Sequence, residues 1–323
     1  MMERVIEPPV LARQRETSWS LTAAFVVMVA IFAIGPFVVY PVFLMKALCF
    51  ALFACAFNLL IGYVGLISFG HAMFFGWASY VTAYAAKSWG WPPELAIIVG
   101  TAAAAVLGVV AGSLAIRRQG IYFAMITLAL AQMLYFFALQ AKFTGGEDGI
   151  QGVPRGHLFG VFDLSNEMTM YLFILVVFLA GFLLIYRIIN SPFGEVLKAI
   201  RENEQRAISL GYKTERYKLV AFVLSATLAG LAGSLNSLVF QLASLTDVHW
   251  SMSGDVVLMT LLGGLGTVFG PVVGAFLVIA MENYLAPFGQ WVLVIQGAIF
   301  VVCVLLFRRG IVGELAQVLR VQL

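Results

Sequence analysis

The sequence predicts an all-α fold, a polytopic transmembrane helical bundle of about ten spans with both termini in the cytoplasm. Of the 323 residues, 62% are hydrophobic and only 11% are charged, whereas soluble domains carry about 25% charged residues. Apolar runs long enough to cross a bilayer core, about 20 residues each, recur along the chain. The placement of Lys and Arg between these runs predicts the orientation.

The candidate spans are separated by polar stretches or by glycine and proline. They are residues 20–40, 42–62, 65–87, 95–116, 120–140, 169–189, 217–243, 254–267, 268–286 and 290–307. The first run is longer than the apolar region of a signal peptide and is predicted to be a retained helix. The eighth run is short and glycine-rich, so it is either a full span with a broken end or a re-entrant segment. These alternatives give a range of eight to ten spans.

Basic residues gather in four places that ten spans would put on one side of the membrane, the cytoplasmic side. The clusters comprise Arg4, Arg13 and Arg15; Arg117 and Arg118; Lys198, Arg201, Arg206, Lys213, Arg216 and Lys218; and Arg308, Arg309 and Arg320. If residues 254–267 entered the membrane and returned, Arg308 and Arg309 would lie outside. Ten spans is therefore the favoured count.

The same pattern divides the chain. We expect a cytoplasmic N-terminal arm at 1–19, a transmembrane domain at 20–310 with a mildly acidic external loop at 141–168, and a cytoplasmic tail at 311–323. A net charge of +3 without a long basic run argues against nucleic-acid binding. The three cysteines, Cys49, Cys55 and Cys303, show no metal-ligand spacing, so no metal site is expected.

Small residues recur at four-residue spacing in two of the spans. The stripes are Gly100, Ala104, Gly108 and Gly112 in one span, and Ala226, Gly230 and Ser234 beside Ala229, Gly233 and Ser237 in another. Such stripes let helix backbones approach closely. Static helix packing is the favoured interpretation, and a sliding face between moving helices is the alternative.

Glycines also interrupt two apolar stretches, each of which ends in Phe-Gly before a helix. The predicted helix breaks are Gly62, Gly65 and Gly70 in one stretch and Gly263, Gly264, Gly266 and Gly270 in the other. Interrupted helices in corresponding halves of a membrane protein point to a transport pathway. A chance match and an ancient internal repeat explain the similarity equally well.

Residues 190–216 form the large loop on the basic side, and its pattern predicts one or two short amphipathic helices. Ser191 is placed as an N-cap, Pro192 as the first helical residue and Gly211 as the stop signal. The apolar residues Phe193, Leu197, Ile200, Ala207 and Ile208 fall roughly on one helical face. The loop either rests on lipid headgroups or docks a cytoplasmic partner. Acidic residues interleaved with basic ones favour docking.

Several motifs resemble the permeases of branched-chain amino-acid ABC importers, specifically the LivM-like type. The matching segments are Ser191–Glu204 (Ser-Pro-Phe-Gly-Glu-Val-Leu-Lys-Ala-Ile-Arg-Glu-Asn-Glu), Leu210–Tyr212, Tyr217–Phe222, Gly62–Ser79 with Ser-Phe-Gly-His, Gly120–Gln132, Thr144–Ile150 and Leu262–Pro271. Together they cover about residues 40 to 310. Each motif is weak alone, and their combination is specific.

This resemblance implies a permease domain that contacts an ATPase through the loop 190–216. The family pattern Glu-Ala-Ala, three residues, Gly aligns with Gln205, Arg206, Ala207 and Gly211, and the first two positions depart from it. The departure puts the individual contacts in doubt. The candidate coupling residues are Glu195, Arg201, Glu202, Glu204, Ala207 and Gly211.

The resemblance further implies a heterodimer with a second, related permease, two ATPase subunits, a periplasmic substrate-binding protein and a location in the bacterial inner membrane in contact with lipid. No Walker A pattern is present, so ATP and Mg²⁺ are expected in the ATPase subunits, with no cofactor or enzymatic activity in this chain. The expected substrates are branched-chain or similar hydrophobic amino acids. Urea, short amides and small organic acids are alternatives, because specificity in such importers resides largely in the binding protein.

Polar residues inside the spans are the candidates for a translocation pathway. They are Asn58, Ser68, His71, Thr127, Gln132, Asn236 and Gln241. For each one an interhelical hydrogen bond is the simpler interpretation, and His71 is the strongest functional candidate. Lys46 and Glu282 lie near predicted span ends, and no span carries a central charged pair. This argues against a secondary transporter, and the absence of an intramembrane His/Asp/Glu cluster argues against a membrane-embedded enzyme.

Overall fold

The computed structural model describes residues 10–160, 162–289, 291–307 and 310–318. The longer helices are α1 (Val10–Ile34), α2 (Pro41–Ile61), α3 (His71–Ser88), α4 (Pro93–Ala115), α5 (Ile121–Gln140), α6 (Glu167–Ile189), α7 (Pro192–Glu202), α9 (Thr214–Phe240), α11 (Trp250–Gly263), α12 (Gly270–Leu285) and α13 (Trp291–Leu306). The shorter elements are α8 (Glu204–Ser209), α10 (Leu245–Val248), α14 (Gly310–Val318), four 3₁₀ turns (Gly35–Phe37, Lys142–Thr144, Gly146–Asp148, Ala286–Phe288) and the strands β1 (Ile150–Gln151), β2 (His157–Leu158), β3 (Phe162–Asp163) and β4 (Leu242–Ala243).

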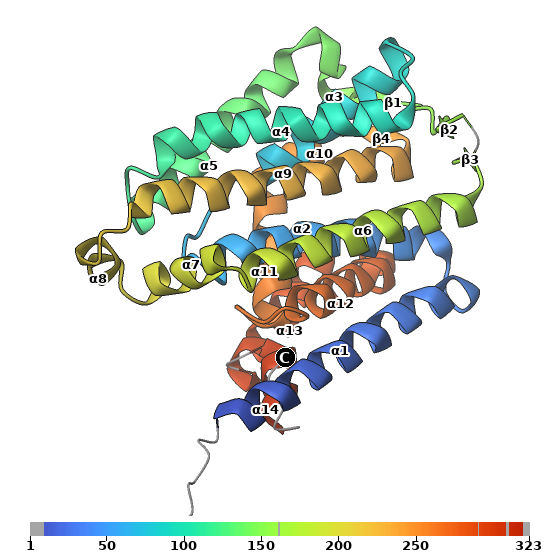
Figure 1. Cartoon of the computed structure of the whole chain (residues 1–323). Helices are drawn as coiled ribbons and strands as arrows, with labels where there is room; N and C mark the ends of the chain where they lie inside the picture. Colours follow the sequence, from blue (N-terminus) through green and yellow to red (C-terminus); the bar gives the residue numbers. More distant parts are fainter. Residues whose placement is uncertain (1–9, 161, 290, 308–309, 319–323) are drawn as a thin grey trace, which may run out of the picture.

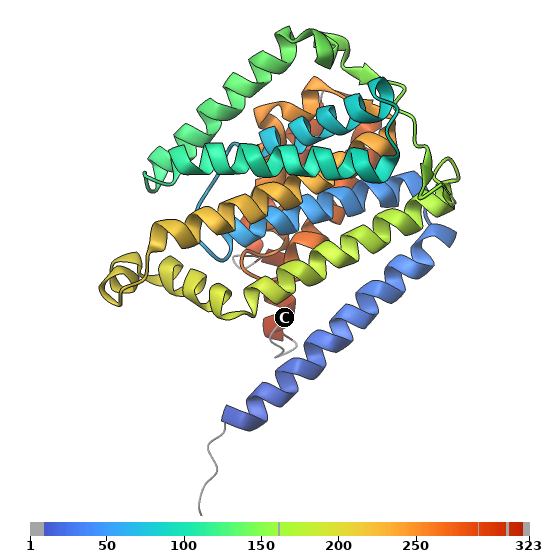
Figure 2. The same ribbon diagram turned by 45° about the horizontal axis from the view of Figure 1, so that its top comes forward.

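Helix α9 is the centre of the bundle and packs against α2, α3 and α4. Figure 1 shows α2, α4, α6 and α9 running side by side, with α7 and α8 projecting from one end and the short strands at the other. We call the end that carries α7 and α8 the loop end. Figure 2 shows α5 standing on one side of the bundle and α1 on the opposite side.

The small-residue stripes are the surfaces through which α9 meets its neighbours. A Cβ atom added to Gly108 of α4 would lie 2.8 Å from the Cβ of Ala226, and one added to Gly100 would lie 2.7 Å from Ser234 Oγ. The second stripe of α9 faces α3, where Gly233 lies against the backbone of Phe75. Tight helix packing at these positions is therefore confirmed.

Within the described residues, five helices are long and apolar enough to cross a membrane: α2, α4, α5, α6 and α9. Shorter apolar helical segments cover Thr22–Phe37, Gly270–Leu285 and Val294–Cys303. The predicted class of helical membrane protein is confirmed. The count of ten spans and the cytoplasmic placement of both termini stay predictions. Arg4, Arg308, Arg309 and Arg320, which contributed to them, lie outside the described residues, as do the ends of the predicted arm and tail.

Several helix boundaries differ from the sequence-based ones, most clearly those of α1, α3 and α11. Helix α1 begins at Val10, so half of the predicted polar arm is helical. Helix α3 begins at His71 rather than near residue 65, because Gly65 adopts a φ of +81° that a right-handed helix does not allow. The predicted span 254–267 is α11, which starts earlier, at Trp250, and ends at Gly263, before Gly264 with a φ of +125°.

Helix α11 lies between contacts with α5 at its start and with the end of α2 after its last residue. At its start, His249 packs its ring against Tyr135 near the end of α5. After its last residue, the backbone N–H of Gly266 donates to Asn58 at the loop end of α2. With 14 residues, α11 measures about 21 Å at 1.5 Å per residue.

The predicted external loop 141–168 is clamped to the end of α9. Strands β1 and β4 pair antiparallel, and Val153 N donates to Gln241 O at 3.0 Å. The guanidinium of Arg155 donates to the carbonyl oxygens of Leu238 (3.3 Å) and Val239 (2.7 Å), the last carbonyls of α9. A cation at a helix C-terminus satisfies unpaired acceptors and complements the helix dipole. The second hairpin pairs β2 with β3.

Candidate functional site

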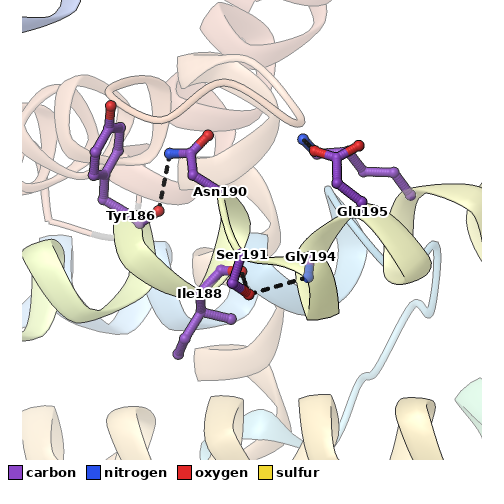
Figure 3. A network of polar contacts seen from close by, with 7 residues as sticks. Tyr186, Ile188, Asn190, Ser191, Gly194 and Glu195 are labelled. Atoms are coloured by element: carbon purple, nitrogen blue, oxygen red, sulfur yellow. Dashed lines mark hydrogen bonds and ion pairs between the residues drawn. The ribbon is translucent and has the colours of Figure 1, made fainter.

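The turn between α6 and α7 is set by side-chain caps (Figure 3). Asn190 Nδ2 donates to Tyr186 O at 2.9 Å, and Ser191 Oγ donates to Ile188 O at 2.6 Å. Ser191 Oγ also accepts from Gly194 N at 3.4 Å, the bond expected of an N-cap. A Cβ added to Gly194 would lie 2.6 Å from Ile188 O, so the turn is tight. The predicted cap is confirmed.

Helix α7 is amphipathic and packs one face on the bundle. Gly194, Leu197 and Ile200 are buried. Phe193 stacks on Tyr217 of α9 with ring centroids 5.7 Å apart. Of the five apolar residues predicted to share one helical face, four are at least partly buried. This packing holds the exposed face of α7 in a defined orientation.

Helix α8 is joined to α9 by a buried charge. Asn203 ends α7 with an extended backbone and caps α8 by accepting from Arg206 N at 3.0 Å. Glu204 then accepts from Lys218 Nζ at 2.5 Å, from Thr214 Oγ1 at 3.1 Å and from Gln119 Nε2 at 3.0 Å. The prediction of one or two short helices is resolved as two, and Glu204 anchors the second one.

The end of α8 presents apolar side chains to the surface. Gly211 adopts a φ of +90°, and its N–H donates to Ile208 O at 2.9 Å, so it stops the helix as predicted. Ala207 is buried, and Ile208 is 48% exposed. Leu210 and Tyr212 are 70% and 41% exposed. We call Ile208, Leu210 and Tyr212 the apolar tip.

The six candidate coupling residues do not share one surface. Glu195 pairs with Lys198 at 2.8 Å and is exposed, like Glu202. Glu204 faces α9, and Ala207 is buried. Arg201 reaches back to the bundle and donates from Nη1 to Gly62 O. The apolar tip was not singled out from the sequence, although three large apolar residues around a helix-stopping glycine were a usable signal.

The two glycine-rich segments lie side by side at the loop end. Asn58 Nδ2 donates to Thr267 O at 2.9 Å, and Asn58 Oδ1 accepts from Gly266 N at 3.1 Å. A Cβ added to Gly62 would lie 2.9 Å from Gly266 N. The helix breaks predicted separately at 62–70 and 263–270 are thus parts of one joint, and Asn58 is the side chain that binds them.

His71 sits in a closed aromatic environment. Its Nε2 is 2.9 Å from Ser225 Oγ, which donates to Ala56 O at 2.5 Å. The rings of Phe57, Phe74 and Phe222 approach the imidazole edge-on. The side chain is fully buried, so it joins α2, α3 and α9 in this conformation and does not face an open passage.

The other pathway candidates are spread over both ends of the bundle. Ser68 Oγ accepts from Gly70 N, and Thr127, which packs on Gly70, donates to Ala124 O. Asn236 is buried with an unpaired Oδ1. Gln132 is partly exposed, and Gln241 is exposed at the end of α9 with a φ of +52°. No continuous line of polar groups follows from these positions in the described residues.

Two polar contacts between helices were not predicted from the sequence. Ser253 of α11 accepts from Ala72 N in the first turn of α3 at 2.9 Å. Lys46 of α2 forms an ion pair with Glu282 of α12 at 3.0 Å, and Asp255 of α11 lies within electrostatic range of both. The two charged residues that lie near predicted span ends are therefore partners. Their separation of 236 residues in sequence concealed this.

At the opposite end, Asp247 is a buried carboxylate that closes a capping box. It accepts from Ser244 N and Ser244 Oγ, both at 3.2 Å. Burial raises the pKa of Asp247 to about 6, against the lowering effect of the Ser244 bonds and of Lys46. The fully buried hydroxyl of Tyr80 lies within electrostatic range of this carboxylate and has no hydrogen-bond partner.

The architecture and these contacts define a multi-pass helical membrane protein with an ordered two-helix element at one end. The profile of the family described as branched-chain amino acid transport system, permease component, matches residues 41–304. The chain belongs to this family of transport permeases. The LivM-like resemblance stated from the motifs is confirmed.

The chain is 26% identical over 277 residues to the high-affinity branched-chain amino acid transport system permease protein LivM of Escherichia coli (strain K12), and 25% identical over 277 residues to LivM of Salmonella typhimurium. Each alignment covers 79% of this chain and 65% of the relative's length. The ribose import permease protein RbsC of Bacillus subtilis is 28% identical over 196 residues, which are 56% of this chain and 58% of that protein. No solved structure matches the chain.

Proposed function

We propose that this chain is the permease subunit of an ABC importer and carries branched-chain or similar hydrophobic amino acids. The observation that carries the proposal is the α7–α8 element. It projects from the bundle, is fixed to it by Phe193 and Glu204, and exposes the apolar tip. A rigid element of this kind can transmit the movement of a docked partner to the helices that continue from it.

The proposed partners follow from this role. A related second permease pairs with this chain in the inner membrane of a bacterium, and the passage forms between them. Two ATPase subunits bind ATP and Mg²⁺ and dock on residues 190–216. A periplasmic binding protein delivers the substrate on the other side. The similarity to the LivM permeases supports branched-chain amino acids, and the similarity to the ribose permease RbsC supports keeping other small substrates, including urea, amides and organic acids, as alternatives.

Docking through the apolar tip is consistent with its exposure. Interfaces gain most of their free energy from a few buried aromatic or aliphatic anchors, and Leu210 and Tyr212 are such side chains next to a fixed helix end. The exposed carboxylates Glu195 and Glu202 supply polar contacts around them. In this proposal Glu204 and Ala207 shape the element rather than touch the ATPase.

The test is reconstitution of the full complex in proteoliposomes with the binding protein and ATP. Leu210→Glu and Gly211→Pro are expected to reduce substrate-stimulated ATP hydrolysis and uptake at least about tenfold, as loss of a hot-spot anchor does. Asp163→Asn, on the external hairpin, is the control. Normal coupling in Gly211→Pro would remove the docking role, and uptake without any ATPase subunit would remove the importer proposal.

A secondary transporter is the second candidate, favoured by one observation. Lys46, Asp255 and Glu282 bring ionisable groups together across α2, α11 and α12, and intramembrane ionisable groups often mark ion-coupled pathways. Uptake by the chain alone, driven by a proton or sodium gradient and lost in Glu282→Gln, would establish this alternative.

A further inference from the structure

The two glycine-rich segments that meet at the loop end, within residues 62–70 and 263–270, are called the glycine joint. This joint has a polar link to α7. Arg201, in the last turn of α7, donates from Nη1 to Gly62 O, the carbonyl that follows the last residue of α2. These residues are 139 positions apart in sequence. The side chain therefore joins the projecting element to a helix with which it shares no local chain connection.

Two glycines make room for this side chain. A Cβ added to Gly65 would lie 3.2 Å from Arg201 Cγ, and a Cβ added to Gly266 would lie 3.3 Å from Arg201 Nη1. Gly62 supplies the accepting oxygen. Gly65 and Gly266 have φ angles of +81° and +75°, which side chains other than glycine adopt only with strain. Residues from both glycine-rich segments thus surround one guanidinium.

The chemistry of the contact suits an arginine. The guanidinium is a rigid planar fork with five donors. The carbonyls at the end of α2 carry partial negative charge because no further turn donates hydrogen bonds to them. A cation there is complementary to the helix end. Asn58, one turn earlier in α2, binds Gly266 and Thr267, so α7, α2 and the α11–α12 turn meet within a few residues.

We propose that Arg201 is a positioning residue that couples α7 to the glycine joint, so that displacement of α7 by a docked ATPase moves the loop ends of α2, α11 and α12 together. This inference rests on the proposed function and deepens it. It assigns to Arg201 a role inside the permease in place of a direct contact with the ATPase. The α7–α8 element, on which the ATPase pushes, and the glycine joint then move together.

The experiment combines activity with a distance measurement on the full complex in nanodiscs. Spin labels are placed at Glu202→Cys on α7 and Leu265→Cys in the α11–α12 turn, after replacement of Cys49, Cys55 and Cys303 by Ala. The label-to-label distance is measured without nucleotide and with trapped ATP. Uptake and substrate-stimulated ATP hydrolysis are measured on the same variants without labels.

With Arg201 present, we expect a narrow distance distribution that is the same in both nucleotide states. Arg201→Ala should broaden it and make it state-dependent, and should lower uptake per ATP hydrolysed at least fivefold while the complex still assembles. Arg201→Lys keeps one donor and should give an intermediate result. Lys142→Ala, an exposed basic residue in the loop after α5 and outside residues 190–216, is the control and should match the wild type.

Two results would overturn the inference: unchanged uptake per ATP in Arg201→Ala, or a wild-type distance that changes on trapping ATP. A merely structural role for Arg201 would lower assembly and leave uptake per ATP in the remaining complex intact, which also counts against it. If the wild-type complex shows no substrate-stimulated hydrolysis, the proposed function fails instead. In that case the label-to-label distances are measured in the isolated permease chain, with and without Arg201→Ala. They decide whether Arg201 holds α7 to the glycine joint.

Discussion

Lys218 Nζ lies 2.5 Å from Glu204 Oε1 and joins the second turn of α9 to the first residue of α8. The Lys218 side chain is 3% exposed and that of Glu204 is 21% exposed, so the pair is largely withdrawn from water. The short helix that ends in the apolar tip is thereby fixed to the central helix of the bundle. Removal of either charge should therefore weaken the attachment of the apolar tip to α9.

Glu204→Ala is expected to destabilise the protein by about 3 kcal/mol, because removal of one partner leaves a buried ammonium without its counter-charge. The double variant Glu204→Ala/Lys218→Met should recover most of this loss. Unfolding in mixed micelles with increasing SDS measures both. Equal stability of the single and double variants would show that the ion pair does not hold α8.

Substitutions at the contact between α4 and α9 should compensate each other. Gly108→Ala places a methyl group 2.8 Å from Ala226 Cβ, and such overpacking typically costs about 1–3 kcal/mol. Ala226→Gly should restore stability in the Gly108→Ala background. Gly254→Ala, where an added Cβ meets nothing within 4 Å, is the matched control. The apparent Tm in detergent is measured for the wild type and the three variants. If Ala226→Gly does not raise the Tm of Gly108→Ala, direct packing of the two residues is contradicted.

The Lys46–Glu282 pair should show coupling in a double-mutant cycle. Each side chain is about one third exposed (32% and 30%), so the expected loss for Lys46→Met is about 1–2 kcal/mol, between values for exposed and buried pairs. Lys46→Met/Glu282→Met should lose less than the sum of the single changes. Strict additivity of the unfolding free energies would mean that the two groups do not interact in the membrane protein.

Gly211 should tolerate asparagine better than alanine. Its φ of +90° strains any residue with a Cβ, although no atom lies within 4 Å of the added group. We expect Gly211→Ala to cost about 1 kcal/mol locally and to increase hydrogen exchange in peptides covering α8. Gly211→Asn should exchange more slowly than Gly211→Ala, since asparagine enters this region more readily. The opposite order would show that the positive φ is not required.

The buried carboxylate of Asp247 should make stability depend on pH. Its folded-state pKa of about 6 lies above the ordinary value, which is about 4, so ionisation costs the folded state free energy as pH rises from about 4 through about 6. Asp247→Asn keeps an acceptor for Ser244 and loses this dependence. Its apparent Tm relative to wild type should therefore be higher at pH 7.5 than at pH 5.0. Asp163→Asn is the exposed control, and an equal difference at both pH values would refute the expectation.

The sequence was sufficient where the physical signal is local. Ser191, Pro192 and Gly211 act through hydrogen bonds and φ angles within a few residues, so the start and stop of the α7–α8 element could be predicted. The small-residue stripe through Gly108 likewise predicted close packing, because four-residue spacing alone puts these positions on one helix face. The helical membrane class followed from composition.

The tertiary structure decided which distant residues meet. The bonds of Arg201 to Gly62 and of Glu204 to Lys218, and the pairing of Lys46 with Glu282, depend on how separate helices are placed relative to one another. A local pattern carries no information on that placement, since any polar residue near a helix end is compatible with many neighbours. For this chain the sequence determined the elements and their order, and the packing of α9 against its neighbours determined which polar groups became partners.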